Sequence, residues 1–161
     1  MEYEYIMTIG QDSHRFEEQV IEGNTIKLGG YDVPYEKPFS ANSDGDVILH
    51  AITNAVSQYT GINILGGAAD VLCLEQGIKD SKVFLHEAMK SLGDAKISFI
   101  SISIECLRPK IKPYVEAIKE SLAEIIGIPS TRIGLQATTG EGLTEFGKGN
   151  GIAVLACITV Q

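Results

Sequence analysis

Hydrophobic residues recur with two different periods along the chain, and each period predicts a different kind of element. Over residues 97–107, isoleucines alternate with mostly polar side chains, which is typical of a strand with one buried face. Between residues 47 and 59, apolar side chains return at helical spacing, and Ser43 or Asp44 can cap the start of this helix. The chain therefore combines strands with helices.

The same two periods, together with the placement of glycine and proline, predict the remaining elements. Two more helices are expected at residues 83–92 and 112–126, and three more strands at residues 3–10, 132–138 and 151–160. A hairpin that turns at Gly29-Gly30 is expected over residues 25–34, and a loop over residues 61–77.

These elements predict a single domain of the α+β class over residues 1–161. The expected architecture is an α/β sandwich, in which three helices cover one face of a four-stranded mixed sheet and a small β-hairpin is added. With 161 residues and 44% apolar content, the chain can bury one proper core.

The charge balance excludes two classes of partner. A formal net charge of −8, with no segregated basic patch, disfavours binding to nucleic acid or to an anionic membrane surface. The longest apolar stretch, around residues 152–160, is about half of the ~20 residues that a membrane-spanning helix needs. The N-terminus lacks the basic region of a signal peptide. We therefore expect neither export nor membrane insertion.

The cysteines agree with a reducing environment. Cys73, Cys106 and Cys157 are odd in number, far apart and without Cys-x-x-Cys spacing, so the sequence supports neither a disulfide framework nor a cysteine-type zinc site. A cytoplasmic location is expected.

Asp12, His14 and His50 are the candidate metal ligands. Residues two apart on an extended segment face the same way, and a histidine on the neighbouring helix can meet them from the side. One carboxylate and two imidazoles can hold one zinc and leave a coordination position open. The other interpretation is a surface aspartate with two unrelated histidines, but two of only three histidines occur beside turn-rich acidic segments. His86, the third, is expected on the surface.

Two further acidic residues precede His50. Asp44 and Asp46 are expected in the first turn of its helix, where carboxylates stabilise the helix dipole. An alternative role for Asp46 is to orient His50 as a metal ligand.

A glycine-rich segment at residues 137–151 is the candidate anion site. It contains five glycines, three threonines, two glutamates and one lysine after a predicted strand. Such a segment offers backbone N–H groups, hydroxyls and a cation to phosphate, and a carboxylate to a second divalent ion. A glycine-rich surface turn is the alternative. Arg108 and Lys110 either serve a nucleotide phosphate or cap a sheet edge.

Taken together, these segments resemble the 2-C-methyl-D-erythritol 2,4-cyclodiphosphate synthase family, the zinc enzymes of the non-mevalonate isoprenoid pathway. The likeness runs nearly end to end and rests on several motifs in order. They are Gly10-Gln11-Asp12-Ser13-His14, Leu28-Gly29-Gly30, Val33 to Lys37, Ser43-Asp44-Gly45-Asp46 with His50-Ala51, Asp80-Ser81, Pro109-Lys110, Ala137-Thr138-Thr139 with Glu141, and Gly147-Lys148-Gly149.

The resemblance implies a homotrimer with active sites at subunit interfaces, and a role for each matching position. Asp12, His14 and His50 would hold one Zn²⁺ per subunit, and Glu141 a Mg²⁺ or Mn²⁺ on the substrate. The implied catalytic positions are Thr139 and Asn42. The cytidine pocket would comprise Cys106, Leu107, Arg108, Pro109, Lys110, Ile111 and Lys112 of a neighbouring subunit. Other expected substrate contacts are Ser13, Ser43, Gly66, Thr138, Gly140, Glu145 and Lys148.

The implied reaction is the cyclisation of 4-diphosphocytidyl-2-C-methyl-D-erythritol 2-phosphate to the 2,4-cyclodiphosphate, with release of CMP. The implied partners are this nucleotide-diphosphate substrate and further copies of the chain.

The chain departs from the family pattern at several positions. Asn42 stands where a histidine is usual, so this side chain can donate a hydrogen bond but cannot carry a proton. Residues 64–72 lack the usual ribose-binding aspartate, which Asp70 could replace. Glu145 stands at an aromatic position, and Lys148 replaces an arginine. Two other functions therefore stay open: a non-catalytic relative that binds an isoprenoid or nucleotide diphosphate, and a metallohydrolase.

Overall fold

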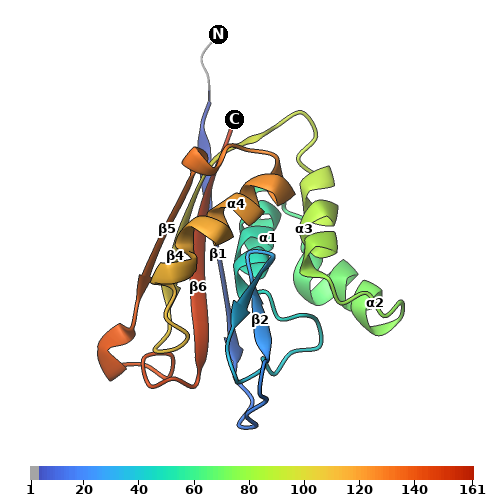
Figure 1. Cartoon of the computed structure of the whole chain (residues 1–161). Coiled ribbons are helices and arrows are strands. Elements are labelled where there is room, and N and C mark those ends of the chain that lie inside the picture. The colour runs from blue at the N-terminus through green and yellow to red at the C-terminus, as the bar shows by residue number, and fades with distance from the viewer. Residues whose placement is uncertain (1–3) are drawn as a thin grey trace.

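A four-stranded mixed sheet forms the centre of the structure, a computed structural model that describes residues 4–161 (Figure 1). Its strands, in spatial order, are β1 (Ile6–Arg15), β6 (Gly151–Val160), β4 (Ile97–Glu105) and β5 (Ile133–Thr138). The β1–β6 and β6–β4 pairs are antiparallel, whereas β4 and β5 are parallel. This order makes β1 and β5 the two edges of the sheet.

Helices pack on the sheet and on one another. They are α1 (Val47–Thr60), α2 (Ala69–Leu74), α3 (Ser81–Lys90) and α4 (Val115–Ile126). Helix α1 contacts β1 and β6, α4 contacts β5, and α3 packs against α1. The separate hairpin consists of β2 (Thr25–Leu28) and β3 (Tyr31–Pro34). Short 3₁₀ turns occupy Lys112–Tyr114, Ser130–Arg132 and Gly140–Gly142. The α+β class, the mixed sheet and the hairpin are thus confirmed.

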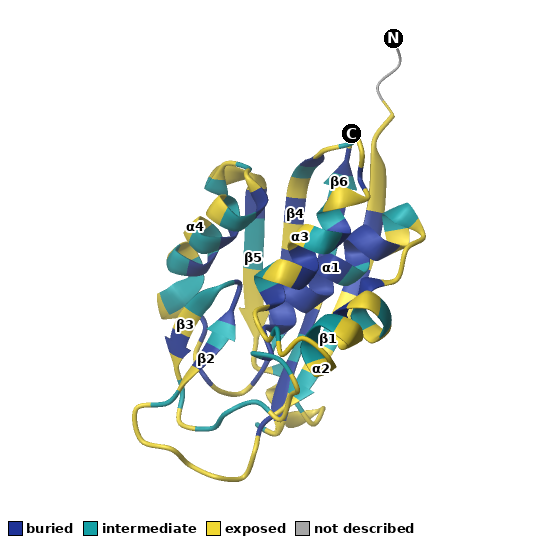
Figure 2. Ribbon diagram, turned by 90° about the vertical axis from the view of Figure 1, so that its right-hand side faces the viewer, coloured by how far each residue is buried: buried dark blue, intermediate teal, exposed yellow. Residues whose placement is uncertain are grey.

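The core lies between the helices and one face of the sheet. Along β4 the isoleucines at 100, 102 and 104 are buried, while Ser101 on the opposite face is exposed. Helix α1 is buried along most of its length (Figure 2). Full burial of a side chain such as Ile or Leu contributes roughly 1.5–3 kcal/mol, so this layer supplies the main driving force for folding.

No element within residues 4–161 covers the other face of the sheet. Its apolar side chains include Met7, which is 70% exposed, together with Ile9, Phe99 and Leu155. Exposed apolar side chains that gather on one sheet face are typical of a surface that contacts another protein.

Two predicted elements differ from the structure. Strand β1 begins at Ile6 and continues to Arg15, so Asp12 and His14 lie within it rather than after it. The predicted start at residue 3 lies outside the described residues. The prediction of a loop over residues 61–77 was wrong in part, because α2 forms there after an irregular turn at Gly66-Gly67. The two glycines interrupt the apolar pattern just before this short helix, whose Ala69 and Leu72 side chains join the hydrophobic core.

No helix within residues 4–161 is long and apolar enough to cross a membrane. The thiols of Cys73, Cys106 and Cys157 are all free.

Candidate functional site

Close packing between β1 and α1 builds the first part of the site. A Cβ atom at Gly10 would overlap the carbonyl oxygen of Ala51 and the amide nitrogen of Ala55, so only glycine admits the helix at this distance. The Thr8 hydroxyl donates to the Ala55 carbonyl at 2.7 Å. Asn54 of α1 also donates to the Gln11 carbonyl at 3.0 Å. These contacts hold residues 51–55 of α1 against residues 8–11 of β1, which places His50 beside the strand.

Asp12, His14 and His50 meet where this strand and helix converge. His50 Nδ1 lies 3.0 Å from Asp12 Oδ2 and 3.1 Å from His14 Nε2. His14 Nε2 lies 3.5 Å from Asp12 Oδ2. Ligands at ~2.0–2.1 Å from a tetrahedral zinc are about 3.3 Å apart, so one ion fits among these atoms. Within residues 4–161, these three form the group of His, Cys, Asp or Glu side chains whose possible metal-binding atoms all lie within 4.8 Å of one another.

The charge state of these residues suits a metal ligand set. Burial lowers the pKa of His14, although the Asp12 carboxylate beside it opposes this shift. A neutral imidazole keeps the lone pair that a metal requires. Coordination by one carboxylate and two imidazole rings would leave a net positive charge on a bound divalent cation, which favours an anionic fourth ligand.

Ser81 and Asp44 orient the His50 ring. His50 Nε2 lies 2.8 Å from the Ser81 hydroxyl, which in turn bonds to Asp44 Oδ1. The backbone N–H of Ser81 also donates to Asp44 Oδ2 at 3.1 Å. If Nε2–H donates to Ser81, the Nδ1 lone pair faces Asp12 and His14. The sequence places Ser81 directly after Asp80 at the start of a helix, but it did not predict that the Ser81 hydroxyl contacts His50.

Asp46 does not orient His50, so that alternative was wrong. Its carboxylate is fully buried and accepts from the N–H groups of Gly29 at 2.8 Å, Gly30 at 2.6 Å and Leu49 at 3.1 Å. It therefore caps α1, in place of Ser43 or Asp44, and ties the hairpin to it. Burial raises the pKa of Asp46, and the three N–H donors oppose that shift in part.

A cavity of about 390 Å³ opens beside the metal triad. Several positions predicted from the sequence gather on its wall, together with residues of α2. They are Asn42, Ser43, Gly66 and Asp70, joined by Asn54, Cys73 and Leu74. The α2 segment, which departs from the family pattern, therefore forms one side of the pocket that the metal would face.

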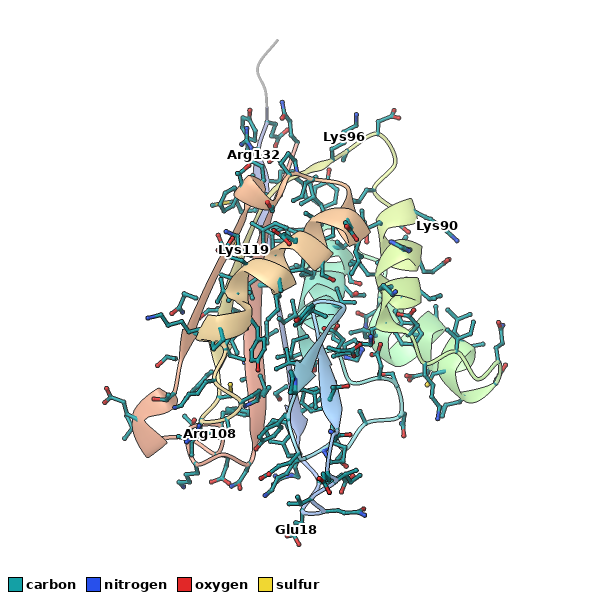
Figure 3. All side chains as sticks on the ribbon, viewed as in Figure 1. Glu18, Lys90, Lys96, Arg108, Lys119 and Arg132 are labelled. Atoms are coloured by element: carbon teal, nitrogen blue, oxygen red, sulfur yellow. The ribbon has the colours of Figure 1, made fainter. Side chains whose placement is uncertain are left out.

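The predicted nucleotide residues form a second cluster at the opposite edge of the sheet. A cavity of about 170 Å³ is lined by Cys106, Pro109, Lys110, Ile111, Lys112, Ala137, Thr138 and Thr139. Arg108 lines a separate hollow with Tyr35 and Tyr114. Figure 3 shows Arg108 at the end of the sheet that carries the β5–β6 loop, away from Arg132. Burial raises the pKa of the Cys106 thiol to about 12, so this cysteine stays protonated.

The β5–β6 loop, defined as residues 139–150, carries the last predicted group. Glu141 is exposed and adopts φ 53°, an uncommon conformation for a residue other than glycine. Glu145 accepts from Asn150 at 2.6 Å and from Lys148 at 3.1 Å, and these donors lower its pKa. Glu145 also lines a hollow with Ser13, on the open face of the sheet. Leu107 anchors this loop by donating its N–H to Phe146.

Within one chain the two clusters do not meet. Strands β6 and β4 separate β1 from β5, so the edges are about 14 Å apart at ~4.8 Å per strand. The structure brings Asn42, Ser43 and Gly66 to the metal triad, and Thr138 and Thr139 to the Cys106–Lys112 segment. It does not bring Thr139 or Glu141 to the triad.

This fold and site define the class: an α+β sandwich protein with a metal-binding triad of one aspartate and two histidines at a strand–helix junction. A model of the YgbB family matches residues 5–161. The chain belongs to this family, whose curated relatives are 2-C-methyl-D-erythritol 2,4-cyclodiphosphate synthases.

Relatives match over nearly the whole chain. The synthase of Chlamydia caviae is 45% identical over 157 residues, covering 97% of this chain and 89% of the relative. A solved synthase in a CDP-bound form is 32% identical with a TM-score of 0.82, covering 97% of this chain and 100% of that one. The bifunctional IspDF of Campylobacter jejuni is 25% identical with a TM-score of 0.87. The match covers 99% of this chain and 42% of that protein. The resemblance read from the sequence is confirmed.

Proposed function

We propose that this protein is a zinc-dependent cyclodiphosphate synthase that converts 4-diphosphocytidyl-2-C-methyl-D-erythritol 2-phosphate to 2-C-methyl-D-erythritol 2,4-cyclodiphosphate and CMP. The convergence of Asp12, His14 and His50 within 3.5 Å carries this proposal. The naming of the 45% identical relative as this synthase supports the substrate. A cytoplasmic location accompanies the proposal.

In the proposed reaction an oxygen of the 2-phosphate attacks the β-phosphorus of the diphosphate. The bond from that phosphorus to the CMP oxygen breaks, CMP takes the electron pair, and an eight-membered ring closes. Asp12, His14 and His50 would hold zinc, and Glu141 a magnesium or manganese ion. When bound, these cations neutralise charge on the reacting phosphates. The chain's residues position the substrate, so no side chain need become covalently attached.

The side chains have separate tasks in this scheme. Ser81 and Asp44 keep His50 turned toward its co-ligands. The Thr139 hydroxyl, beside the nucleotide cavity, would hydrogen-bond a reacting phosphate. Asn42 lines the metal pocket and can donate an N–H to phosphate, but it cannot transfer a proton at neutral pH. Lys148 would supply positive charge near the loop.

The proposed active unit is a homotrimer with a site at each subunit boundary. The metal triad and the nucleotide cluster lie at opposite edges of one sheet, so a complete site needs the β1 edge of one copy and the β5 edge of another. The open sheet face, with Met7, Ile9 and Leu155 exposed, is the proposed contact surface. A cyclic arrangement of three copies uses both edges of every subunit. The CDP-bound relative supports a cytidine nucleotide in the second cluster.

One observation favours a second candidate, a non-catalytic protein that binds an isoprenoid or nucleotide diphosphate. Asn42 and the α2 segment, two departures from the family pattern, both line the metal pocket. Changes on that wall would alter substrate handling more than metal binding, because the three metal ligands are retained.

The test is an assay of purified protein loaded with zinc and supplied with the substrate and magnesium. Release of CMP together with the cyclic diphosphate is the expected result. Tight substrate binding without CMP would replace the proposal with the non-catalytic function. Release of inorganic phosphate, with water as acceptor, would instead indicate a metallohydrolase.

A further inference from the structure

A carboxylate from another strand braces the β5–β6 loop at its base. Thr144 Oγ1 donates to Glu105 Oε1 at 2.6 Å, and the same hydroxyl oxygen accepts from the Gly147 N–H at 3.0 Å. Glu105 is the last residue of β4 and lies on the open face of the sheet, in register with Thr138 of β5. One hydroxyl therefore connects two points of the loop to the sheet.

Glu105 also packs against the turn between Thr139 and Glu141. A Cβ atom at Gly140 would overlap Glu105 Oε1, and the φ of Gly140 is +71°. Gly140 lies between Thr139, which is proposed to contact phosphate, and Glu141, which is proposed to hold a metal ion. The backbone that joins these two residues therefore packs directly on the Glu105 side chain. A larger residue at 140, or a displaced carboxylate at 105, would shift both neighbours.

The backbone of this loop needs such support. Glu141 holds a positive φ of 53°, and a non-glycine residue keeps this conformation where its surroundings fix it. The N–H of Leu107 donates to the Phe146 carbonyl at 3.0 Å and that of Cys106 to the Thr138 carbonyl at 3.1 Å. The first bond holds the middle of the loop and the second holds the residue just before it, while the Thr144 side chain connects the loop to Glu105 of the sheet.

We propose that Glu105 is a positioning residue that acts through Thr144 and Gly140 to set the orientation of Thr139 and Glu141. A hydroxyl that donates to a carboxylate makes a shorter and stronger bond than one between neutral groups. Glu105 itself touches no substrate in this scheme. The catalytic consequence rests on the proposed function, because that function gives Thr139 and Glu141 their tasks.

Four variants test the kinetic consequence. Glu105→Ala and Thr144→Val remove the bond, whereas Glu105→Gln and Thr144→Ser keep an acceptor and a donor. The first pair is expected to lower kcat about tenfold and to raise the magnesium concentration for half-maximal rate, with zinc content unchanged. The conservative pair is expected to retain most of the rate. The Glu105→Ala/Thr144→Val double variant should lose much less rate than the product of the two single losses, because both substitutions remove the same Glu105–Thr144 bond.

Hydrogen exchange tests the bracing without any turnover. The Gly147 amide and its neighbours in residues 139–149 should exchange faster in Glu105→Ala and Thr144→Val than in the wild type and in Thr144→Ser. Glu116→Ala is the matched control, because Glu116 is exposed on α4 and pairs with Lys119 at the surface. The control is expected to match the wild type in both assays.

Three results would overturn the inference: unchanged exchange in Glu105→Ala, additive losses in the double variant, or an equal loss of rate in Glu116→Ala. Failure of the proposed function would look different. In that case the wild-type protein would release no CMP, while the exchange of residues 139–149 would still rise in Glu105→Ala.

Discussion

The two edges of the sheet hold their functional residues in different ways. At the β1 edge, ligands come from a strand and a helix that pack so closely that position 10 must be glycine. At the β5 edge, Thr139 and Glu141 lie in a loop braced by side-chain hydrogen bonds to Glu105 and Thr144. The packed core thus fixes the positions of the metal-triad side chains, whereas a few polar contacts at the surface fix those of Thr139 and Glu141.

This difference has an energetic basis. Separating α1 from β1 would expose buried apolar side chains, so the metal ligands can move apart only at a large cost in free energy. The loop is held by hydrogen bonds that each contribute about 0.5–1.5 kcal/mol net, so it can change its position at a much smaller cost in free energy. In the proposed trimer, a rigid metal site facing an adjustable loop would suit the proposed reaction, in which two phosphates must be brought together.

The largest effect is expected from removing a ligand at the β1 edge. His50→Ala should abolish stoichiometric zinc and lower CMP release at least a thousandfold, roughly the contribution of a metal that stabilises several kcal/mol of transition-state charge. Elemental analysis and the CMP assay measure the two effects. His86→Ala is the control, since His86 is exposed on α3 and its ring hydrogen-bonds to the Ile125 carbonyl, away from the triad. Full zinc retention by His50→Ala would remove it from the ligand set.

The matching substitution at the β5 edge should separate chemistry from metal binding. Thr139→Ala is expected to lower kcat by about 10²-fold, as for loss of one hydrogen bond to a transition state, with zinc content unchanged. Loss of zinc in this variant would contradict the separation of the two edges.

Mixing the two inactive variants tests whether the edges belong to different subunits. If His50→Ala and Thr139→Ala chains are unfolded, combined equally and reassembled, sites that join two intact edges should restore about a quarter of wild-type activity. Each variant reassembled alone is the control. No recovery in the mixture would place both edges of a site in one subunit.

Gly10→Ala tests the close packing that holds the β1 edge together. The added methyl overlaps the α1 backbone, so the free energy of unfolding should fall by about 1–3 kcal/mol, and zinc should bind more weakly. Gly134→Ala is the matched control on β5, where a Cβ would meet atoms no closer than 3.8 Å. Chemical denaturation and zinc titration of both variants give the comparison. Equal stability of the two variants would show that α1 can shift freely.

The smallest effect is expected at the residue behind the metal ligand. Ser81→Ala leaves His50 Nε2 without its 2.8 Å partner, so zinc affinity should fall about tenfold while the fold persists. Ser91→Ala, at the end of the same helix, serves as the control. Competition with a zinc chelator measures the shift, and an unaltered affinity would assign Ser81 a structural role only.

Several features were predictable because they are local. Alternating isoleucines marked β4, and helical spacing marked α1 to within one residue of its end. The two-residue spacing of Asp12 and His14 correctly placed them on one face of an extended segment. The prediction of a loop over residues 61–77 was wrong in part because Gly66 and Gly67 interrupt the apolar pattern just before α2 begins.

The sequence by itself therefore determined most of the elements, the α+β class and the chemical types of the candidate metal ligands, since periodicity reports which face of each element is buried. Only the tertiary structure decided that Asp46 caps α1 while Ser81 and Asp44 orient His50, and that Glu105 meets Thr144. It also decided that the metal and nucleotide clusters lie at opposite edges. Such contacts join residues far apart in the chain, and their partners depend on strand order, register and the distance between packed backbones, which no local pattern encodes.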